Sequence, residues 1–239
     1  MDNRVILQPA YVLHRRPFQN SSLLVDFFTL DYGRVKAVAR GARREKSRYR
    51  ALLQLFTPVL LSFSGRGDVK TVNNVETQVA AISLRGERLF SGLYLNELLV
   101  RLLHQHVEHT ELYQAYQSAL LALQGETGIE VVLRRFEMQL LGELGYGLNL
   151  ETDSHSHQAI SAGQQYRFEP EHGFVAVNPP GDVADDPWLF SGEHLVALRG
   201  LELETAAAAH AAKRLLRLAL QPHLGDKPLA SRSLFTSRS

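Results

Sequence analysis

A change in hydrophobic pattern near residue 80 constrains the fold of this chain more than any other feature. Before it, short runs of β-branched and aromatic residues are separated by turn-forming residues, as in SLLVDFFTL-DYG-RVKAVAR at residues 22–40. After it, leucines and aromatics recur three and four residues apart, the spacing of one helix face. The chain therefore divides into an N-terminal β part and a larger helical part.

The β part predicts five short strands, in the runs VILQPAYVLH, SLLVDFFTL, RVKAVAR, FTPVLLSF and VKTVNNVETQV. Gly33 and the SGRGD stretch at 64–68 supply hairpin turns. The segment YRALLQLF at 49–56 predicts a short helix between the third and fourth strands. Five antiparallel strands with a helix at that place are the layout of an OB-fold barrel. Another small barrel or a sandwich fits the same pattern.

The helical part has an interruption. Leucine spacing predicts three helices between residues 86 and 144, whereas 148–187 is rich in proline and polar residues and contains short strand-like pieces. Helical spacing then resumes to the end of the chain. The predicted fold class is α+β. Its parts are an OB-fold domain (1–80), a first helical part (81–147), an irregular insertion (148–187) and a C-terminal helical part (188–239).

Charge is concentrated in one segment. The formal net charge is only +1, yet eight basic residues and a single acid lie between Arg34 and Arg50, so the remaining chain is acidic on balance. The simplest interpretation of such a basic run is a solvent-exposed loop whose charges only keep the chain soluble. Its position between barrel strands, its richness in arginine and the nearby Tyr49 favour nucleic-acid binding instead, with phosphates on cations and bases stacked on rings. Arg15, Arg16 and Phe18 at the first turn fit the same interpretation.

Other functional classes find little support. The chain has no cysteine, which excludes disulfides and thiolate metal sites, and it contains no phosphate-binding glycine loop or nucleophile motif. We therefore expect no enzyme activity, no cofactor and no metal site, although His155 and His157 are spaced to reach one ion if extended. No apolar run is long enough to span a membrane. We expect a cytoplasmic, nucleoid-associated protein.

Several segments of the sequence resemble one protein family. YVLHRRPFQNSSLLVDFF, FSGLYLNELLVRLL, LRRFEMQLLGELGYG and the closing KPLASR, in this order, are similar to the bacterial RecO family of recombinational DNA repair mediators. The resemblance implies an N-terminal OB-fold, binding to single- and double-stranded DNA, and annealing of complementary strands. It also implies recruitment by the C-terminal tail of single-strand DNA-binding protein, and joint action with RecR in loading RecA. Many family members carry a four-cysteine zinc finger in the interrupting segment. This chain lacks those cysteines, so we expect packing alone to hold the segment.

The resemblance and the charge pattern together assign residues to these roles. DNA binding is expected at Arg34, Lys36, Arg40, Arg43, Arg44, Arg48, Arg66 and Lys70. Binding of the acidic, phenylalanine-ended partner tail is expected at Arg134, Arg135, Lys213, Arg214 and Arg217, provided that their two helices adjoin. Ordinary amphipathic helices explain these last five equally well. The closing KPLASR either joins one of these sites or braces the chain end.

Two other functional classes remain open. An RNA-binding OB protein of the translation apparatus would share the basic barrel but leave the helical part unexplained. A protein-only adaptor would use the helical part, with the basic run incidental.

Overall fold

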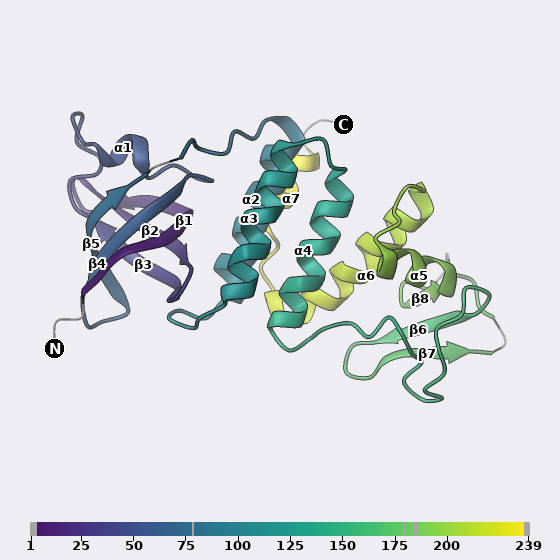
Figure 1. The fold of residues 1–239 in the computed structure, drawn as a ribbon. Helices are drawn as coiled ribbons and strands as arrows, with labels where there is room; N and C mark the ends of the chain where they lie inside the picture. Colours follow the sequence, from purple (N-terminus) through teal and green to yellow (C-terminus); the bar gives the residue numbers. More distant parts are fainter. Residues whose placement is uncertain (1–3, 78, 179, 184–185, 237–239) are drawn as a thin grey trace. The chain divides into compact units, whose positions relative to one another are not determined.

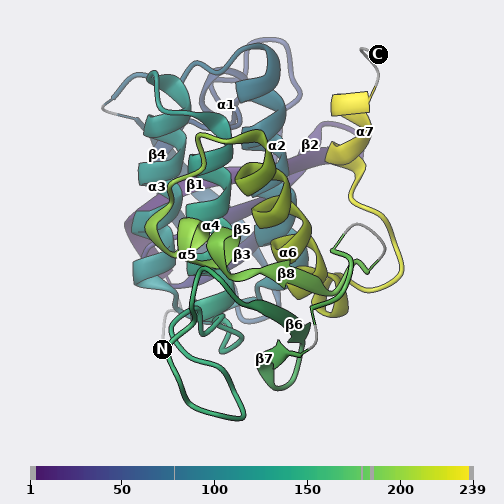
Figure 2. The ribbon, with the colours of Figure 1, turned by 90° about the vertical axis from the view of Figure 1, so that its right-hand side faces the viewer.

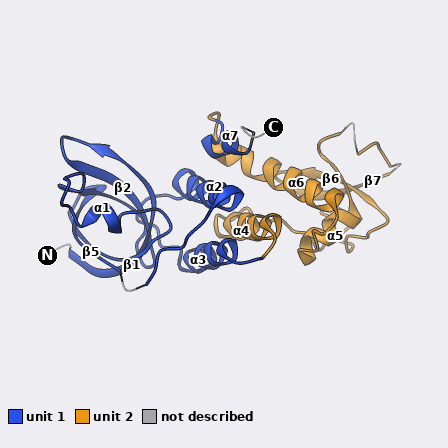
Figure 3. Cartoon of the chain, turned by 90° about the horizontal axis from the view of Figure 1, so that it is seen from above, with its two compact units in different colours: residues 1–126, 228–239 blue, residues 127–227 orange. Residues whose placement is uncertain are grey.

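The computed structural model describes residues 4–77, 79–178, 180–183 and 186–236. The chain forms two compact units (Figure 3). Unit 1 comprises residues 1–126 and 228–239, and unit 2 comprises residues 127–227. The helices expected between 81 and 147 are divided between the two units.

A closed five-stranded barrel forms the N-terminal part of unit 1 (Figure 1). Its strands are β1 (Arg4–Phe18), β2 (Ser22–Thr29), β3 (Gly33–Ala39), β4 (Pro58–Ser64) and β5 (Val69–Glu76). The order around the barrel is β1-β2-β3-β5-β4. This architecture confirms the predicted OB-like barrel followed by helices and the α+β class.

One strand pair differs from the expected antiparallel set. β3 and β5 pair in parallel, while the other four pairs are antiparallel. The reason is connectivity: strands alternate in direction along the chain, but β4 turns away to pair with β1, which leaves β3 beside β5. β1 reaches both β2 and β4 because it is 15 residues long and is bent at two irregularities in register.

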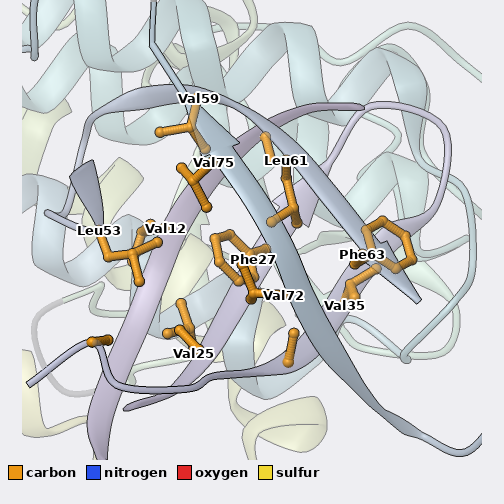
Figure 4. Packing of buried hydrophobic residues seen from close by; sticks show 14 residues of the cluster. Val12, Val25, Phe27, Val35, Leu53, Val59, Leu61, Phe63, Val72 and Val75 are labelled. Carbon is orange, nitrogen blue, oxygen red and sulfur yellow. The ribbon is translucent and has the colours of Figure 1, made fainter. Parts of the chain in front are cut away.

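Alternating side chains fill the barrel. Val35, Ala37 and Ala39 of β3 point inward and are fully buried, whereas the residues between them are partly exposed. Phe27 lies in the interior among valines and leucines of all five strands (Figure 4). The core is therefore a packed side-chain interior without need of a ligand.

The helix between the third and fourth strands is shorter than expected. α1 (Tyr49–Leu52) is a single turn, because Leu53 leaves the helix to insert its side chain into the barrel core. The guanidinium of Arg15 fixes this ending, donating to the carbonyl of Leu53 at 2.8 Å and to Oε1 of Gln54 at 2.7 Å. Arg15 is thus a structural residue of the barrel.

Three helices complete unit 1. They are α2 (Gly86–Leu102), α3 (Thr110–Gln124) and the short C-terminal α7 (Ala230–Thr236). The loop between α2 and α3 crosses the β2–β3 turn, where the N–H of His106 donates to the carbonyl of Arg34 at 3.0 Å. Gly33 permits this approach, because its φ is +56° and a Cβ there would lie 1.6 Å from the carbonyl oxygen of Val107.

Unit 2 combines helices with a small sheet. Its elements are α4 (Ile129–Glu143), β6 (Gln165–Glu169), β7 (Gly173–Val177), β8 (Leu189–Ser191), α5 (Gly192–Gly200) and α6 (Ala206–Leu224). The sheet has the order β7-β6-β8 (Figure 2). Strands β6 and β7 lie in the segment expected to be an irregular insertion, whereas β8 lies just beyond it, in the part expected to be helical. Helix α6 packs against both α4 and α5, and Thr205 caps its N-terminus by accepting the N–H of Ala208 at 3.1 Å.

Candidate nucleic-acid interface

The basic run lies at one end of the barrel, which we call the basic end (residues 19–21 and 40–50). It follows β3 at the end where β1 turns into β2, because β2 runs away from that turn and β3 returns to it. Ala42 is 1% exposed, and the N–H of Arg43 donates to the carbonyl of Ser21 at 2.9 Å. The segment is thereby fixed to the β1–β2 turn.

The cations of the basic end face solvent. The exposed side chains are Arg40, Arg43, Arg44, Lys46, Arg48 and Arg50. Two of them make hydrogen bonds: Arg43 reaches the carbonyl of Gln19 at 3.4 Å, and Arg48 reaches Oδ1 of Asn74 at 2.5 Å. Within residues 4–77, the structure gives the other four no side-chain partner. Four cations of this segment are therefore available to an anionic ligand.

The aromatic ring of the basic end, that of Tyr49, contacts other parts of the barrel. Tyr49 packs against the barrel core, and its hydroxyl donates to the carbonyl of Asn73 at 3.4 Å. The guanidinium of Arg48 lies over the ring, 5.4 Å from its centroid. Both the ring and the hydroxyl of Tyr49 thus already have protein partners, and its role as a stacking surface for bases stays a prediction.

Arg34 is half-buried, and its guanidinium is bonded to the protein itself. Its guanidinium donates to the carbonyl of Val100 near the C-terminal end of α2, where a cation also complements the helix dipole. Its Nε is buried. Arg34 therefore holds α2 on the barrel, a role that its place in a basic run did not reveal.

The remaining candidates on the barrel are spread over its length. Lys36 lies midway along the outer face of β3, opposite Asp26. Arg66 occupies the β4–β5 turn, at the end of the barrel away from the basic end. The Nζ of Lys70 donates to the carbonyl of Gly65 at 3.3 Å, beside that turn. A seven-residue strand spans about 20 Å, so the eight predicted residues do not form one patch.

Helices cover part of the strand face that OB-folds often use for nucleic acid. Tyr11 and Phe28 of the barrel contact the rings of Tyr113 and Tyr116 on α3, at centroid distances of 5.3 to 6.1 Å. Burial raises the pKa of both α3 tyrosines, so their hydroxyls stay neutral. Asn96 of α2 joins this contact by donating to the carbonyl of Leu13 at 2.9 Å. The uncovered basic end is the better place for a large anionic ligand.

In unit 2, two of the five predicted tail-binding residues are bonded to the unit itself. Arg134 is 4% exposed and pairs with Glu137, itself 1% exposed, at 3.0 Å. Arg214 donates to the carbonyls of Val183 at 3.2 Å and Leu189 at 2.6 Å, with its guanidinium 4.3 Å from the ring centroid of Phe190. Both arginines hold unit 2 together, so they are poorly placed to receive a peptide.

The other three tail-binding candidates are exposed. Arg135 lies on α4, and Lys213 and Arg217 lie one turn apart on α6. Their two helices adjoin, as the expectation required, and Nζ of Lys213 lies 3.7 Å from Glu130 of α4. Val131 and Met138 are half-buried on the same face of α4 as Arg135, given their helical spacing. Cations and apolar edges thus occur together on this pair of helices.

The loop-rich insertion is organised by a carboxylate as well as by packing. Asp153 is 3% exposed, and its carboxylate accepts the N–H groups of His155, Ser156 and Ala176 at 2.9, 2.5 and 2.5 Å. We expected packing alone to hold this segment, but the hydrogen bonds to Asp153 also hold it. His155 and His157 are exposed, and among the residues with described positions no three potential ligands gather as a metal site.

The closing KPLASR segment, from Pro228 onward, is engaged within unit 1. Leu229 and Ser231 are buried, and the guanidinium of Arg101 donates to the carbonyl of Pro228 at 3.3 Å. The ring of Phe235 meets that of Phe90 edge-on at a centroid distance of 5.8 Å. These contacts hold the chain end, but they do not come from the side chains of Lys227 and Arg232, whose bracing role stays a prediction. Separately, no helix within the described ranges is long and apolar enough to cross a membrane.

Comparison with known proteins gives matches along nearly the whole chain. The family model for Recombination protein O N terminal matches residues 1–79, and that for Recombination protein O C terminal matches residues 83–233. The chain is 46% identical over 229 residues to DNA repair protein RecO from Salmonella paratyphi B, Salmonella newport and Salmonella typhimurium. Each alignment covers 95% of this chain and 93% of the relative.

Proposed function

The chain belongs to the RecO family of DNA repair proteins, and we propose that it binds single- and double-stranded DNA and anneals complementary strands as a recombination mediator. With RecR, it would help to load RecA onto single-stranded DNA coated by single-strand DNA-binding protein. The observation that carries the DNA-binding role is the group of exposed cations at the basic end of the barrel. Arg40, Arg43 and Arg44 are its centre.

Annealing follows from charge neutralisation and needs no catalytic group. Two strands repel through their phosphates, and cations that contact the backbone lower this repulsion and release counterions. Backbone contacts carry no sequence information, so the base edges remain free to pair. Lys36 and Arg66 lie apart from the basic end, and we assign them to a second strand or to the continuation of the first.

The partner-tail role rests on the adjoining helices α4 and α6. Arg135, Lys213 and Arg217 would hold the acidic residues of the tail of single-strand DNA-binding protein, and the half-buried apolar residues beside Arg135 would receive its terminal ring. Such a ligand needs both charge and an apolar surface. Arg134 and Arg214 would support this surface from beneath rather than contact the tail.

Annealing of two complementary oligonucleotides tests the DNA role. The variant R40S/R43S/R44S removes three exposed cations from the basic end, and R135S/K213S/R217S removes three from unit 2 as a control matched in charge. The proposal expects slow annealing from the first variant and normal annealing from the second. Equal annealing by wild type and the basic-end variant would assign the DNA contact elsewhere.

Binding of a labelled peptide with the acidic, phenylalanine-ended tail sequence tests the partner role. Here R135S/K213S/R217S is the test variant and should lose affinity for the peptide. R40S/R43S/R44S is the control and should retain that affinity. If both bind the peptide as wild type does, the tail site lies on another surface.

A further inference from the structure

The basic end presents its cations from an ordered segment. Successive turns run through it, with hydrogen bonds from the N–H of Arg44 to Gly41, of Ser47 to Arg44 and of Arg50 to Ser47, at 3.1, 3.0 and 3.1 Å. The buried Ala42 anchors its first turn to the barrel. Its arginines therefore project from a backbone that is already shaped before any ligand binds, which lowers the entropic cost of binding.

The rings near these cations are only partly exposed. Tyr49 packs on the barrel core beneath Arg48 and donates to Asn73, and Phe18, at the end of β1, is half-buried. The exposed tyrosine of the barrel, Tyr32, lies in the β2–β3 turn at the opposite end, edge-on to Phe63 at 5.6 Å. The exposed ring of Tyr32 is thus separated from the cations along the barrel.

We infer that the basic end binds the sugar-phosphate backbone of a single strand without stacking its bases. This inference rests on the proposed DNA-binding function and specifies the part of the ligand that is recognised. Single-strand binding proteins ordinarily combine cations with aromatic platforms, each stacked base adding about 1–3 kcal/mol. Here the cations act alone, so affinity arises from phosphate neutralisation and every base stays available to a complementary strand.

The inference predicts that the bases can be removed from the ligand with little loss of affinity. The probes are an oligothymidylate and an abasic oligonucleotide of equal length, each long enough to cover the ~4–16 nucleotides of an OB-fold site. Binding to the full-length protein is measured at equal salt. Affinities that agree within about 2-fold support the inference, because both strands carry the same phosphates.

Two further variants make the test independent of the abasic chemistry. F18L/Y49L removes the ring of Tyr49 in the basic end and that of the adjacent Phe18, and Y32L removes the exposed ring at the other end of the barrel. Each variant is first checked for a folded barrel by circular dichroism. Unchanged affinity of folded F18L/Y49L for oligothymidylate supports the inference, and Y32L should likewise bind as wild type does.

The outcomes separate this inference from the function on which it rests. If oligothymidylate binds but the abasic strand is weaker by about 5-fold or more, base stacking contributes and the inference is overturned while DNA binding stands. An equivalent loss in F18L/Y49L would overturn it in the same way. If neither strand binds, the DNA-binding function itself fails, and the inference with it.

Discussion

The carboxylate of Glu97 in helix α2 accepts three hydrogen bonds from the start of helix α7. Two come from the N–H and hydroxyl of Ser231, at 2.8 and 2.6 Å, and one comes from the N–H of Ala230 at 2.8 Å. An N-terminal helix turn has N–H groups without intrahelical partners, and Glu97 satisfies two of them. The end of the chain is thereby attached to α2 in unit 1.

We predict that Glu97→Ala releases α7 from α2. Hydrogen bonds to a charged group contribute about 1.5–3 kcal/mol, more than a one-turn to two-turn helix can replace by itself. Hydrogen exchange should therefore lose protection in residues 230–236 and retain it in the barrel. Glu87→Ala, which removes an exposed acid from the same helix, serves as the control. Persistent protection of α7 in Glu97→Ala would mean that its apolar contacts suffice.

The same contact should depend on pH. Burial acts to raise the pKa of Glu97, but the hydrogen bonds from Ser231 and Ala230, together with Arg101, outweigh it and hold the pKa below its ordinary value. A carboxylate with a lowered pKa stabilises the folded state above its unfolded pKa, about 4.3, and this contribution is lost as the pH falls through the folded pKa. Protection of α7 should thus be constant near neutrality and decline below about pH 4.

Asp153 makes a corresponding prediction for unit 2. Burial opposes ionisation, yet the N–H groups of Ser156, Ala176 and His155 overcome this effect and lower the pKa of Asp153 to about 2. Asp153→Asn should cost about 1–2 kcal/mol of unfolding free energy, because an amide nitrogen cannot accept those bonds. The stabilisation is present above about pH 4 and disappears as the pH falls toward 2, since the folded pKa is the lower one. Urea unfolding at several pH values measures this, with His155→Ala as a variant expected to match wild type.

Gly33 is predicted to tolerate no side chain. Gly33→Ala would place a Cβ within 1.6 Å of the carbonyl oxygen of Val107 and force an L-residue to φ +56°. The backbone conformation alone costs about 1 kcal/mol or more, and the collision must also displace the α2–α3 loop from the barrel. Thermal unfolding should show a clear loss of stability. Gly67→Ala, where a Cβ meets no atom within 4 Å, should differ little from wild type.

Neighbouring arginines of α4 are predicted to behave oppositely. Arg134→Ala removes the cation that contacts the buried carboxylate of Glu137 at 3.0 Å, a change that typically costs about 3–5 kcal/mol. Arg135→Ala alters an exposed residue and should leave stability within about 0.5 kcal/mol. Denaturant unfolding of the two variants side by side tests this. Similar midpoints would show that the buried pair contributes no net stability.

The architecture was predictable because it depends on periodic features. Alternation along β3 and the three-and-four spacing of leucines after residue 80 are local patterns, and the barrel and helices follow them. The roles of individual cations were not predictable in this way. Arg34 caps a helix end 66 residues away in sequence, and Arg214 binds two carbonyls of the insertion. A basic residue has the same appearance in sequence whether its partner is a phosphate or a carbonyl of its own chain.

The parallel β3–β5 pair and the contacts of Tyr49 were missed for a related reason. Both depend on which strands meet when the barrel closes, and this is a property of the whole barrel rather than of a segment. Asp153 could have been suspected, because an aspartate followed by serine and histidine residues readily accepts N–H groups two and three residues ahead.

The salt dependence of single-strand binding tests the central claim most directly, namely that the basic end is the DNA contact. The equilibrium constant for an oligothymidylate would be measured across a salt series for wild type, R40S/R43S/R44S and the charge-matched control R135S/K213S/R217S. If the three arginines each contact a phosphate, the slope of log K against log salt becomes shallower by about 2 in the first variant and stays unchanged in the control. Identical slopes for wild type and R40S/R43S/R44S would contradict the claim and move the DNA contact away from this end of the barrel.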